Sequence, residues 1–476
     1  MPMREHPFRE NADEIEDLLK QYEDLRAGKK ASFLEEESFE IIIDYFNEKN
    51  NFFKAIEVAE TALDYFPYSG ELFIKKADLL IAIYNYDEAL AVLQQAEFFD
   101  ADNIDIYILK TDAYLALDMQ QKAAALLEEA LLIFEGDDKI NLLFELADVY
   151  DDYEEFEKVF DCLELILEQE PANEEALYKI CFWTDFTGRN EESIRLHQHI
   201  IDEHPYSELA WFNLGSAYQG LKLYEKAIDA YQYAVVINDK FDYAYRNMGD
   251  AYIRLRKYKE AIEVLEKVGE ITRPEDVIFE AIGHCYHKLG KFATSRFNYR
   301  KASHINALDS KLHYKIALTY ISEKKWAKAI EQLEDALRIH KNVPDYNLAI
   351  GQCSLQLEKY KEAVHYFSMV VRSRPKNVRG WKALITCLYK TEHFEEAIVQ
   401  CNAALKVTEG KPLLHFLYSG VLFAAAKSKE ALLQLETGLK KSPNLVKSFI
   451  ELNPSILQNP HVVDLLARYR KPKRKK

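Results

Sequence analysis

Glycine and proline are scarce in this 476-residue chain, at 15 and 13 residues, and cysteine is scarcer still, at six. So little glycine and proline favours helices over sheets and turns, and no alternating strand pattern bounded by turn residues appears. The cysteines form no CxxC pair, and several fall at expected buried positions. They indicate reduced core thiols rather than a disulfide framework.

Long hydrophobic runs are also missing. No segment approaches the roughly 20 apolar residues of a membrane helix, and the first residues carry no apolar core of a signal peptide. Phosphate loops, nucleophile elbows and zinc-protease helices are absent as well. We therefore expect a cytoplasmic protein that is not an enzyme, with no cofactor, no metal and no small-molecule substrate.

What the chain does have is an amphipathic helical pattern, clearest between Trp211 and Ala234. Apolar residues recur at helical spacing in two segments separated by a break at residues 220–222. Small residues at Gly215 and Ala227 would let the two helix backbones approach closely. The same pattern recurs 34 residues later, where Met248 and Gly249 occupy the positions of Leu214 and Gly215.

This pattern resembles the tetratricopeptide repeat, with its aromatic, Leu-Gly, Tyr, Ala, aromatic, Ala and Pro positions at fixed offsets. The resemblance covers roughly residues 36 to 445. It implies an all-α fold, a right-handed superhelical solenoid of antiparallel helix pairs, with a concave groove lined by the first helix of each pair. It also implies binding to extended or helical segments of other proteins, so we expect a scaffold that assembles a complex.

The register predicts twelve units that begin at residues 36, 70, 104, 140, 174, 208, 242, 276, 310, 344, 378 and 412. The steps are 34 residues except for one of 36, whose two extra residues we expect in the turn at residues 135–138. The small position of the second helix is alanine in nine of the twelve units. Five prolines fall where that helix should end: Pro67, Pro171, Pro205, Pro375 and Pro443.

Acidic and basic residues are distributed unevenly along the chain. Residues 1–171 carry 43 acidic and 14 basic residues, whereas the remainder carries 36 acidic and 47 basic ones, within a net charge of −18. We predict a tail and capping helix over 1–35, acidic repeats over 36–173, net basic repeats over 174–445, capping helices over 446–469 and a basic tail over 470–476. The weak units starting at residues 140 and 174 favour a bend between the two arrays.

The acidic repeats carry an aspartate at the ninth position of each unit: Asp44, Asp78, Asp112 and Asp148. Further carboxylates, among them Glu145 and Asp152, lie on neighbouring inner positions. Stacked like charges repel unless a cation or basic partner relieves them. The pattern predicts an acidic groove for a Lys/Arg-rich segment, and a solvated helix face without a partner stays open as the alternative.

In the later repeats, the inner positions carry basic residues instead of acidic ones. Candidate partner-binding residues on their inner positions are Asn213, Arg246, Asn247, His284, Lys288, Lys311, Lys315, Arg379 and Lys382. Asn213 and Asn247 occupy the same position of consecutive units. In some relatives an asparagine at that position binds the backbone of an extended peptide. The relatives that clamp the C-terminal carboxylate of chaperones need two asparagines where Asp250 and Ala281 stand here. This departure argues against that clamp, and the basic residues predict a looser groove for an acidic peptide.

The chain ends in a run of basic residues: Arg468, Arg470, Lys471, Lys473, Arg474, Lys475 and Lys476. These charges suit phosphates, so an adaptor that docks on RNA, the ribosome or an anionic membrane surface through the basic half and the tail is the alternative function. A solubilising end without a partner is equally open. His197, His199 and His204 are expected to be surface residues.

Overall fold

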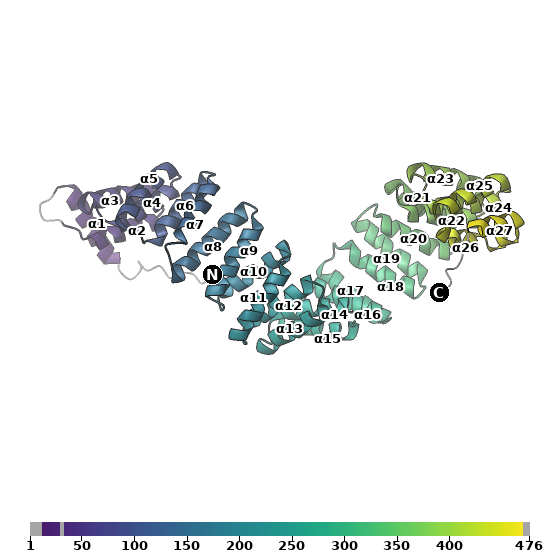
Figure 1. Cartoon of the computed structure of the whole chain (residues 1–476), viewed down its shortest axis with the longest axis horizontal. Coiled ribbons are helices and arrows are strands. Elements are labelled where there is room, and N and C mark those ends of the chain that lie inside the picture. Colours follow the sequence, from purple (N-terminus) through teal and green to yellow (C-terminus); the bar gives the residue numbers. More distant parts are fainter. Residues whose placement is uncertain (1–11, 29–32, 470–476) are drawn as a thin grey trace. The chain divides into compact units, whose positions relative to one another are not determined.

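Helix pairs in tandem make up the computed structural model, which describes residues 12–28 and 33–469 (Figure 1). No strand occurs within these ranges. The first helices of the pairs, called A helices, are α2 (Glu36–Glu48), α4 (Gly70–Ala82), α6 (Ile104–Ala116), α8 (Gly136–Asp152), α10 (Glu174–Thr187), α12 (Glu208–Gly220), α14 (Asp242–Arg254), α16 (Asp276–Lys288), α18 (Ser310–Ser322), α20 (Pro344–Gln356), α22 (Val378–Lys390) and α24 (Pro412–Ala424).

The second helices, called B helices, are α3 (Phe52–Tyr65), α5 (Tyr86–Phe99), α7 (Gln120–Ala130), α9 (Phe156–Gln169), α11 (Asn190–Glu203), α13 (Tyr224–Ile237), α15 (Tyr258–Ile271), α17 (Phe292–Ile305), α19 (Trp326–Ile339), α21 (Tyr360–Ser373), α23 (Phe394–Val407) and α25 (Ser428–Lys441). Eleven of the twelve A helices begin at the predicted residue. The five prolines each follow a B helix by two residues, as at Tyr65 and Pro67. The all-α array of helix pairs is confirmed.

The exception is α8, where the predicted turn at residues 135–138 is wrong. The helix begins at Gly136 and runs for 17 residues, and Asp137 and Asp138 form its first turn. Carboxylates are favoured there because the helix dipole is positive at its N-terminus. The preceding α7 is correspondingly short, with 11 residues. The extra residues therefore lengthen an A helix rather than a loop.

Both ends of the array are covered by additional helices. Helix α1 (Ala12–Arg26) buries Ile15 and Tyr22, and Tyr22 packs in the same core as Phe39 of α2. At the other end, the 3-10 helices Pro443–Leu445 and Pro454–Gln458 flank α26 (Val446–Leu452), and α27 (Pro460–Tyr469) follows. Phe449 and Val462 are fully buried there. These caps shield the apolar edge that an open repeat array would expose.

Every repeat turns from helix A to helix B through one residue with positive φ. The twelve positions are Asn50, Tyr84, Asp118, Glu154, Gly188, Lys222, Arg256, Gly290, Lys324, Glu358, Glu392 and Ala426. Only two of them are glycine, the residue for which this conformation is unstrained. Ten repeats therefore tolerate a strained turn residue between well-packed helices.

Gly290→Ala should lower the free energy of unfolding by about 1 kcal/mol, because φ there is +73° and an L side chain is strained at that angle. A new Cβ would meet no atom within 4 Å, so the effect isolates the backbone. Urea unfolding checks this. Gly269→Ala in α15 is the matched control, since its Cβ is also unobstructed but its backbone is helical, and it should stabilise by about 0.5–1 kcal/mol. Shifts of the same sign would contradict the interpretation.

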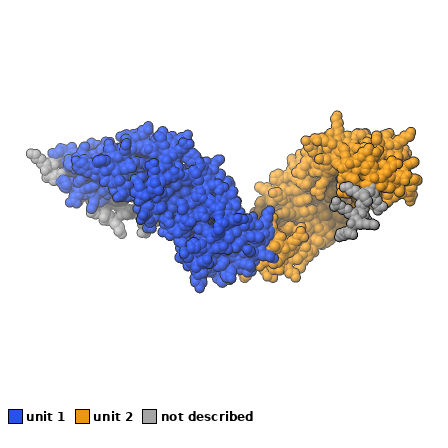
Figure 2. All heavy atoms as spheres, in the orientation of Figure 1, with its two compact units in different colours: residues 1–244 blue, residues 245–476 orange. Residues whose placement is uncertain are grey.

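The chain divides into two compact units, residues 1–244 and 245–476 (Figure 2). We call them unit 1 and unit 2. Unit 1 contains the acidic repeats and α10 to α13, whereas unit 2 contains most of the predicted basic positions. The proposed division by charge near residue 173 stays a prediction. No helix in the described part of the chain is both long and apolar enough to cross a bilayer.

Candidate functional site

The four aspartates of the acidic ladder, Asp44, Asp78, Asp112 and Asp148, lie on α2, α4, α6 and α8 of unit 1. These A helices contact one another in sequence, so the aspartates lie along adjoining helices. The two outer members are paired. Lys75 Nζ donates to Asp44 Oδ1 over 2.9 Å, and Lys179 Nζ lies 3.7 Å from Asp148 Oδ1.

The two central aspartates have no ion pair within the described residues. Desolvation by neighbouring protein atoms raises the pKa of Asp78, and the charges of Asp105 and Asp44 raise it further, although Lys75 opposes them. Desolvation and the charge of Asp78 raise the pKa of Asp112. Both side chains remain exposed to water, so the protein surrounds them without enclosing them. Asp78 and Asp112 are thus accessible carboxylates held close to like charges.

The ladder continues onto α8. Desolvation, Asp112 and Asp148 raise the pKa of Glu145, and Lys179 lowers it. Asp152, the other predicted acidic residue, is exposed at the end of the same helix. The carboxylates from Asp44 to Asp148 therefore form one interacting set, which helical spacing had predicted.

Asp78→Asn with Asp112→Asn should stabilise the protein at pH 7 by a few tenths of a kcal/mol per site, the usual size of like-charge repulsion between exposed groups. The pKa values of both aspartates in the folded protein are raised above the ordinary 3.8. Their ionised forms therefore destabilise the folded protein at neutral pH. That destabilisation fades as the pH falls towards 3.8. Thermal unfolding at pH 7 and pH 4 should show a gain at pH 7 that disappears at pH 4. A gain of equal size at both values would contradict the repulsion.

An exposed row of aromatic side chains follows the acidic ladder on α10, and sequence reasoning missed it. Tyr178, Phe182 and Phe186, which we call the aromatic stripe, are 60%, 60% and 57% exposed. Their spacing of four residues places them on one face of the helix. The spacing of these aromatic residues could be read from the sequence, but spacing alone cannot distinguish an exposed stripe from a buried one.

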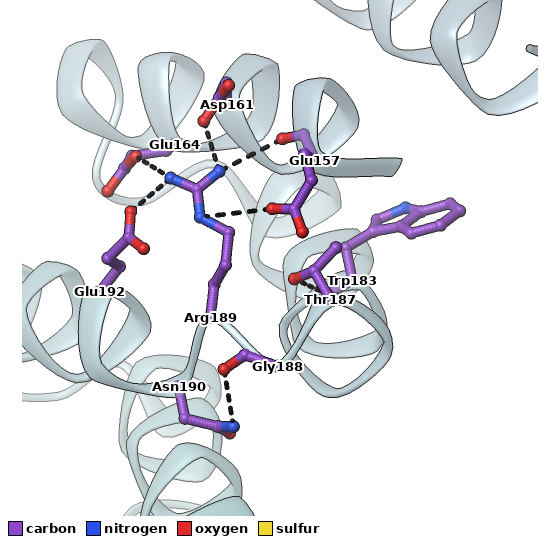
Figure 3. A network of polar contacts seen from close by, with 9 residues as sticks. All are labelled: Glu157, Asp161, Glu164, Trp183, Thr187, Gly188, Arg189, Asn190 and Glu192. Carbon is purple, nitrogen blue, oxygen red and sulfur yellow. Dashed lines mark hydrogen bonds and ion pairs between the residues drawn. The ribbon is translucent and has the colours of Figure 1, made fainter. Parts of the chain in front are cut away.

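Arg189 fixes the turn after α10 (Figure 3). Its guanidinium contacts the carboxylates of Glu157, Asp161 and Glu164 on α9 and of Glu192 on α11. It also lies 4.1 Å from the ring centroid of Phe160. Hydrogen bonds to Glu192 and Asp161 raise the already high pKa of Arg189. One cation therefore joins α9 to the start of α11 and so positions α10 between them.

Asn213 does not line an open groove, and its assignment to the basic groove is wrong. It is 2% exposed, and its Nδ2 donates to the Leu177 carbonyl of α10 over 2.7 Å. The same nitrogen lies 3.1 Å from Nε2 of His197, which is fully buried rather than on the surface. Desolvation lowers the pKa of His197 to about 4. The neutral ring accepts from Asn213, while its Nδ1 donates to the Ser193 carbonyl over 2.7 Å.

Two of the predicted basic residues in unit 2 are occupied by internal contacts. Arg246 donates through both terminal nitrogens to Glu275, at 2.7 Å each, and Lys315 pairs with Glu280. Neither cation is therefore free for a partner. Asn247 is half-buried on α14.

His284 is half-buried on α16, and desolvation together with Lys288, Lys315 and His287 lowers its pKa. The remaining predicted cations are exposed and have no ion pair among the described residues: Lys288, Lys311, Arg379 and Lys382. The basic face of unit 2 is consequently smaller than predicted. In the basic tail, only Arg468 falls within the described residues, where it is exposed on α27. Residues 470–476 lie outside them.

Comparisons with known proteins agree with this architecture. The model of the tetratricopeptide repeat protein 21 C-terminal ARM domain matches residues 215–352. The BBSome complex member BBS4 of Bos taurus is 24% identical over 145 residues, which is 30% of this chain and 28% of that protein. The similarity thus spans under a third of that relative's length.

Solved structures of helical repeats are also similar. The C-terminal part of a TPR repeat-containing protein from Cytophaga hutchinsonii has a TM-score of 0.43 and 16% identity, and covers 54% of this chain and 99% of its own. The APC/C hetero-tetramer Cut9–Hcn1 gives a TM-score of 0.36 at 13% identity, over 86% of this chain and 96% of the matched one. The repeat register, the helix pairs and the family-model match together show that the chain is a tetratricopeptide-type repeat protein.

Proposed function

We propose that this protein is a non-enzymatic scaffold, and that the acidic ladder of unit 1 binds a Lys/Arg-rich segment of a partner protein. The unpaired Asp78 and Asp112 carry the proposal. Their carboxylates are accessible, and their surroundings raise the pKa of both. The two aspartates that flank them, Asp44 and Asp148, already contact lysines. A basic partner would relieve the repulsion between them, and opposite charges across an interface give specificity and fast association.

Two further observations support a role in assembly. Repeat arrays of this type are generally non-enzymatic, and the BBS4 relative is by its description a member of a complex. The exposed cations of unit 2, Lys311 and Lys382 among them, would accept an acidic segment in the same assembly. Six free cysteines, five of them buried, suit the reducing cytoplasm that the sequence predicts.

The test is affinity capture of the tagged full chain from its native cell extract, with and without nuclease, followed by cross-linking mass spectrometry. We expect nuclease-resistant protein partners cross-linked to Lys75 beside the acidic ladder or to Lys311 and Lys382. Asp78→Lys with Asp112→Lys should reduce capture of the partners at the ladder at least tenfold. The double variant Glu331→Gln with Glu334→Gln, on exposed positions of α19, should leave capture unchanged.

Capture that depends on nucleic acid, or that ignores the charge reversal at the ladder, would reject the proposed function. Cross-links concentrated on the C-terminal tail would instead favour docking to RNA or to a membrane surface.

A further inference from the structure

We infer that the segment bound by unit 1 is bipartite: a basic stretch pairs with the acidic ladder, and an adjoining apolar side chain docks on the aromatic stripe of α10. This inference rests on the proposed function and specifies the chemistry of its partner. It is carried by three observations on unit 1, namely the exposure and support of the stripe, the hollows at its two ends and its continuity with the ladder.

The aromatic stripe is exposed but firmly supported. Phe182 and Phe186 stack with ring centroids 6.0 Å apart, and Phe182 lies edge-on to Trp183 at 4.9 Å. Trp183 is buried and stacks in turn on Phe156 of α9 at 5.3 Å. Rigid exposed aromatic rings provide large contact areas at little entropic cost, which is why they dominate the energetic centres of protein interfaces.

Shallow hollows lie at both ends of the stripe. At the C-terminal end of α10, Phe186 and Phe156 line a hollow that is bordered by Glu154, Glu155, Glu157 and Lys158, which pairs with Glu155. At the N-terminal end, Tyr178 lines a second hollow with Leu177 and Pro205. An apolar side chain of a partner could insert at either end, and the border of the first hollow, with three glutamates and one lysine, keeps a net negative charge beside it.

The stripe adjoins the ladder through Lys179. This lysine follows Tyr178 on α10 and reaches back to α8, where its Nζ lies 3.7 Å from Asp148 and 4.9 Å from the ring centroid of Phe144. One cation of the chain thus occupies a site built from a ladder carboxylate and an aromatic ring. Phe182 also stands at the repeat position of Asp148, 34 residues later. The inner position of the array therefore changes from carboxylate to aromatic without a gap.

The negative charge of the acidic repeats indicates which kind of partner can bind at the ladder and the aromatic stripe. Residues 1–171 carry 43 acidic against 14 basic residues, so anionic lipids and nucleic acids are repelled from this face. A purely apolar segment would leave Asp78 and Asp112 facing each other without a counter-charge. A purely basic segment would leave three aromatic rings in water. A protein segment with Lys/Arg residues beside an aromatic or aliphatic residue satisfies both surfaces.

The experiment is selection of peptides from a random 16-residue display library on the full-length protein, followed by affinity measurement of the enriched peptides as synthetic compounds. We expect enrichment of sequences that combine two or more Lys/Arg residues with a neighbouring Phe, Tyr, Trp or Leu. Tyr178→Ser with Phe182→Ser should weaken their binding at least tenfold, and so should Asp78→Asn with Asp112→Asn. Phe297→Ser in α17, whose ring is 58% exposed, is the matched control and should leave affinity unchanged.

Replacement of the apolar residue in an enriched peptide by serine should weaken binding to the parent protein but not to the Tyr178→Ser, Phe182→Ser variant. No enrichment, or enriched peptides that bind all variants equally, overturns the inference. Purely basic peptides whose binding is weakened by Asp78→Asn with Asp112→Asn but not by Tyr178→Ser with Phe182→Ser also overturn it, but they leave the proposed function of the ladder intact. Self-association of the full chain that is lost in the Tyr178→Ser, Phe182→Ser variant would make a second copy the occupant, and would overturn it too.

Discussion

Arg189→Gln should lower the free energy of unfolding of unit 1 by about 2–3 kcal/mol at pH 7, because it leaves a cluster of carboxylates without their shared cation. The Arg189 side chain is only 17% exposed and contacts four carboxylates. Glutamine removes the charge and keeps part of the aliphatic stem, so the loss reports mainly on electrostatics. Urea unfolding followed by fluorescence is suitable, since Trp183 on α10 lies six residues before Arg189 and Trp211 lies on α12.

The pH dependence of this loss has a defined sign. The hydrogen bond from Arg189 lowers the pKa of Glu192 below its ordinary value of 4.5. A carboxylate with a lowered folded pKa contributes stability above its ordinary pKa, and that contribution is lost as the pH falls through the folded value. The difference between the parent and Arg189→Gln should therefore be largest at neutral pH and shrink below pH 4.5.

Lys158→Gln is the matched control. Lys158 pairs with Glu155 on the surface, and both side chains are about half exposed. Such a pair contributes between zero and about 1 kcal/mol. If Arg189→Gln cost no more than this control, the cluster in Figure 3 would be a surface feature rather than the element that holds α10 in place.

The repeat register could be predicted almost completely from the sequence because it rests on local, recurring chemistry. A small residue stands at the same position of eleven of the twelve B helices, Val159 being the exception, and a proline follows five of these helices by two residues. The failure at α8 has a local cause. Gly136 followed by Asp137 and Asp138 has the composition of a turn, but the two aspartates are equally favourable in a first helical turn. Composition alone could not choose between these two structures.

Only part of the candidate site could be predicted, because whether its side chains are accessible depends on contacts between repeats. Helical spacing placed the ladder aspartates on adjoining A helices correctly. It could not show that Arg246 would pair with Glu275, 29 residues away. Nor could it show that Asn213 would be buried against His197, since both residue types are common on surfaces. Whether a polar side chain is free is decided by partners that a repeat position does not specify.

In several helix pairs a smaller residue on one helix lies opposite a larger residue on the other, a relation that the structure makes visible because it shows which positions are in contact. The eighth residue of a unit packs near the twenty-fourth. Where the eighth is glycine, the twenty-fourth is aromatic in three units, which pair Gly215 with Tyr231, Gly283 with Tyr299 and Gly351 with Phe367, whereas Gly249 faces Leu265. Where the eighth is alanine, as at Ala77, Ala147 and Ala317, the twenty-fourth is Leu93, Leu163 or Leu333. The Tyr and Phe side chains at the twenty-fourth position therefore each lie opposite a glycine, and alanine at the eighth position lies opposite the smaller leucine.

Gly215→Ala tests this relation and should destabilise unit 1 by about 2–3 kcal/mol, although alanine is the better helix former by about 1 kcal/mol. A Cβ at residue 215 would lie 2.5 Å from the Tyr231 ring, which is fully buried and cannot move aside without disturbing the core. Tyr231→Leu alone should also destabilise, because it leaves a cavity. The double variant recreates the Ala317–Leu333 pair and should recover most of the stability lost by Gly215→Ala. A double-mutant cycle by urea unfolding measures this coupling. Additive losses would show that the two positions do not exchange volume, and that each repeat is packed individually instead of through this relation.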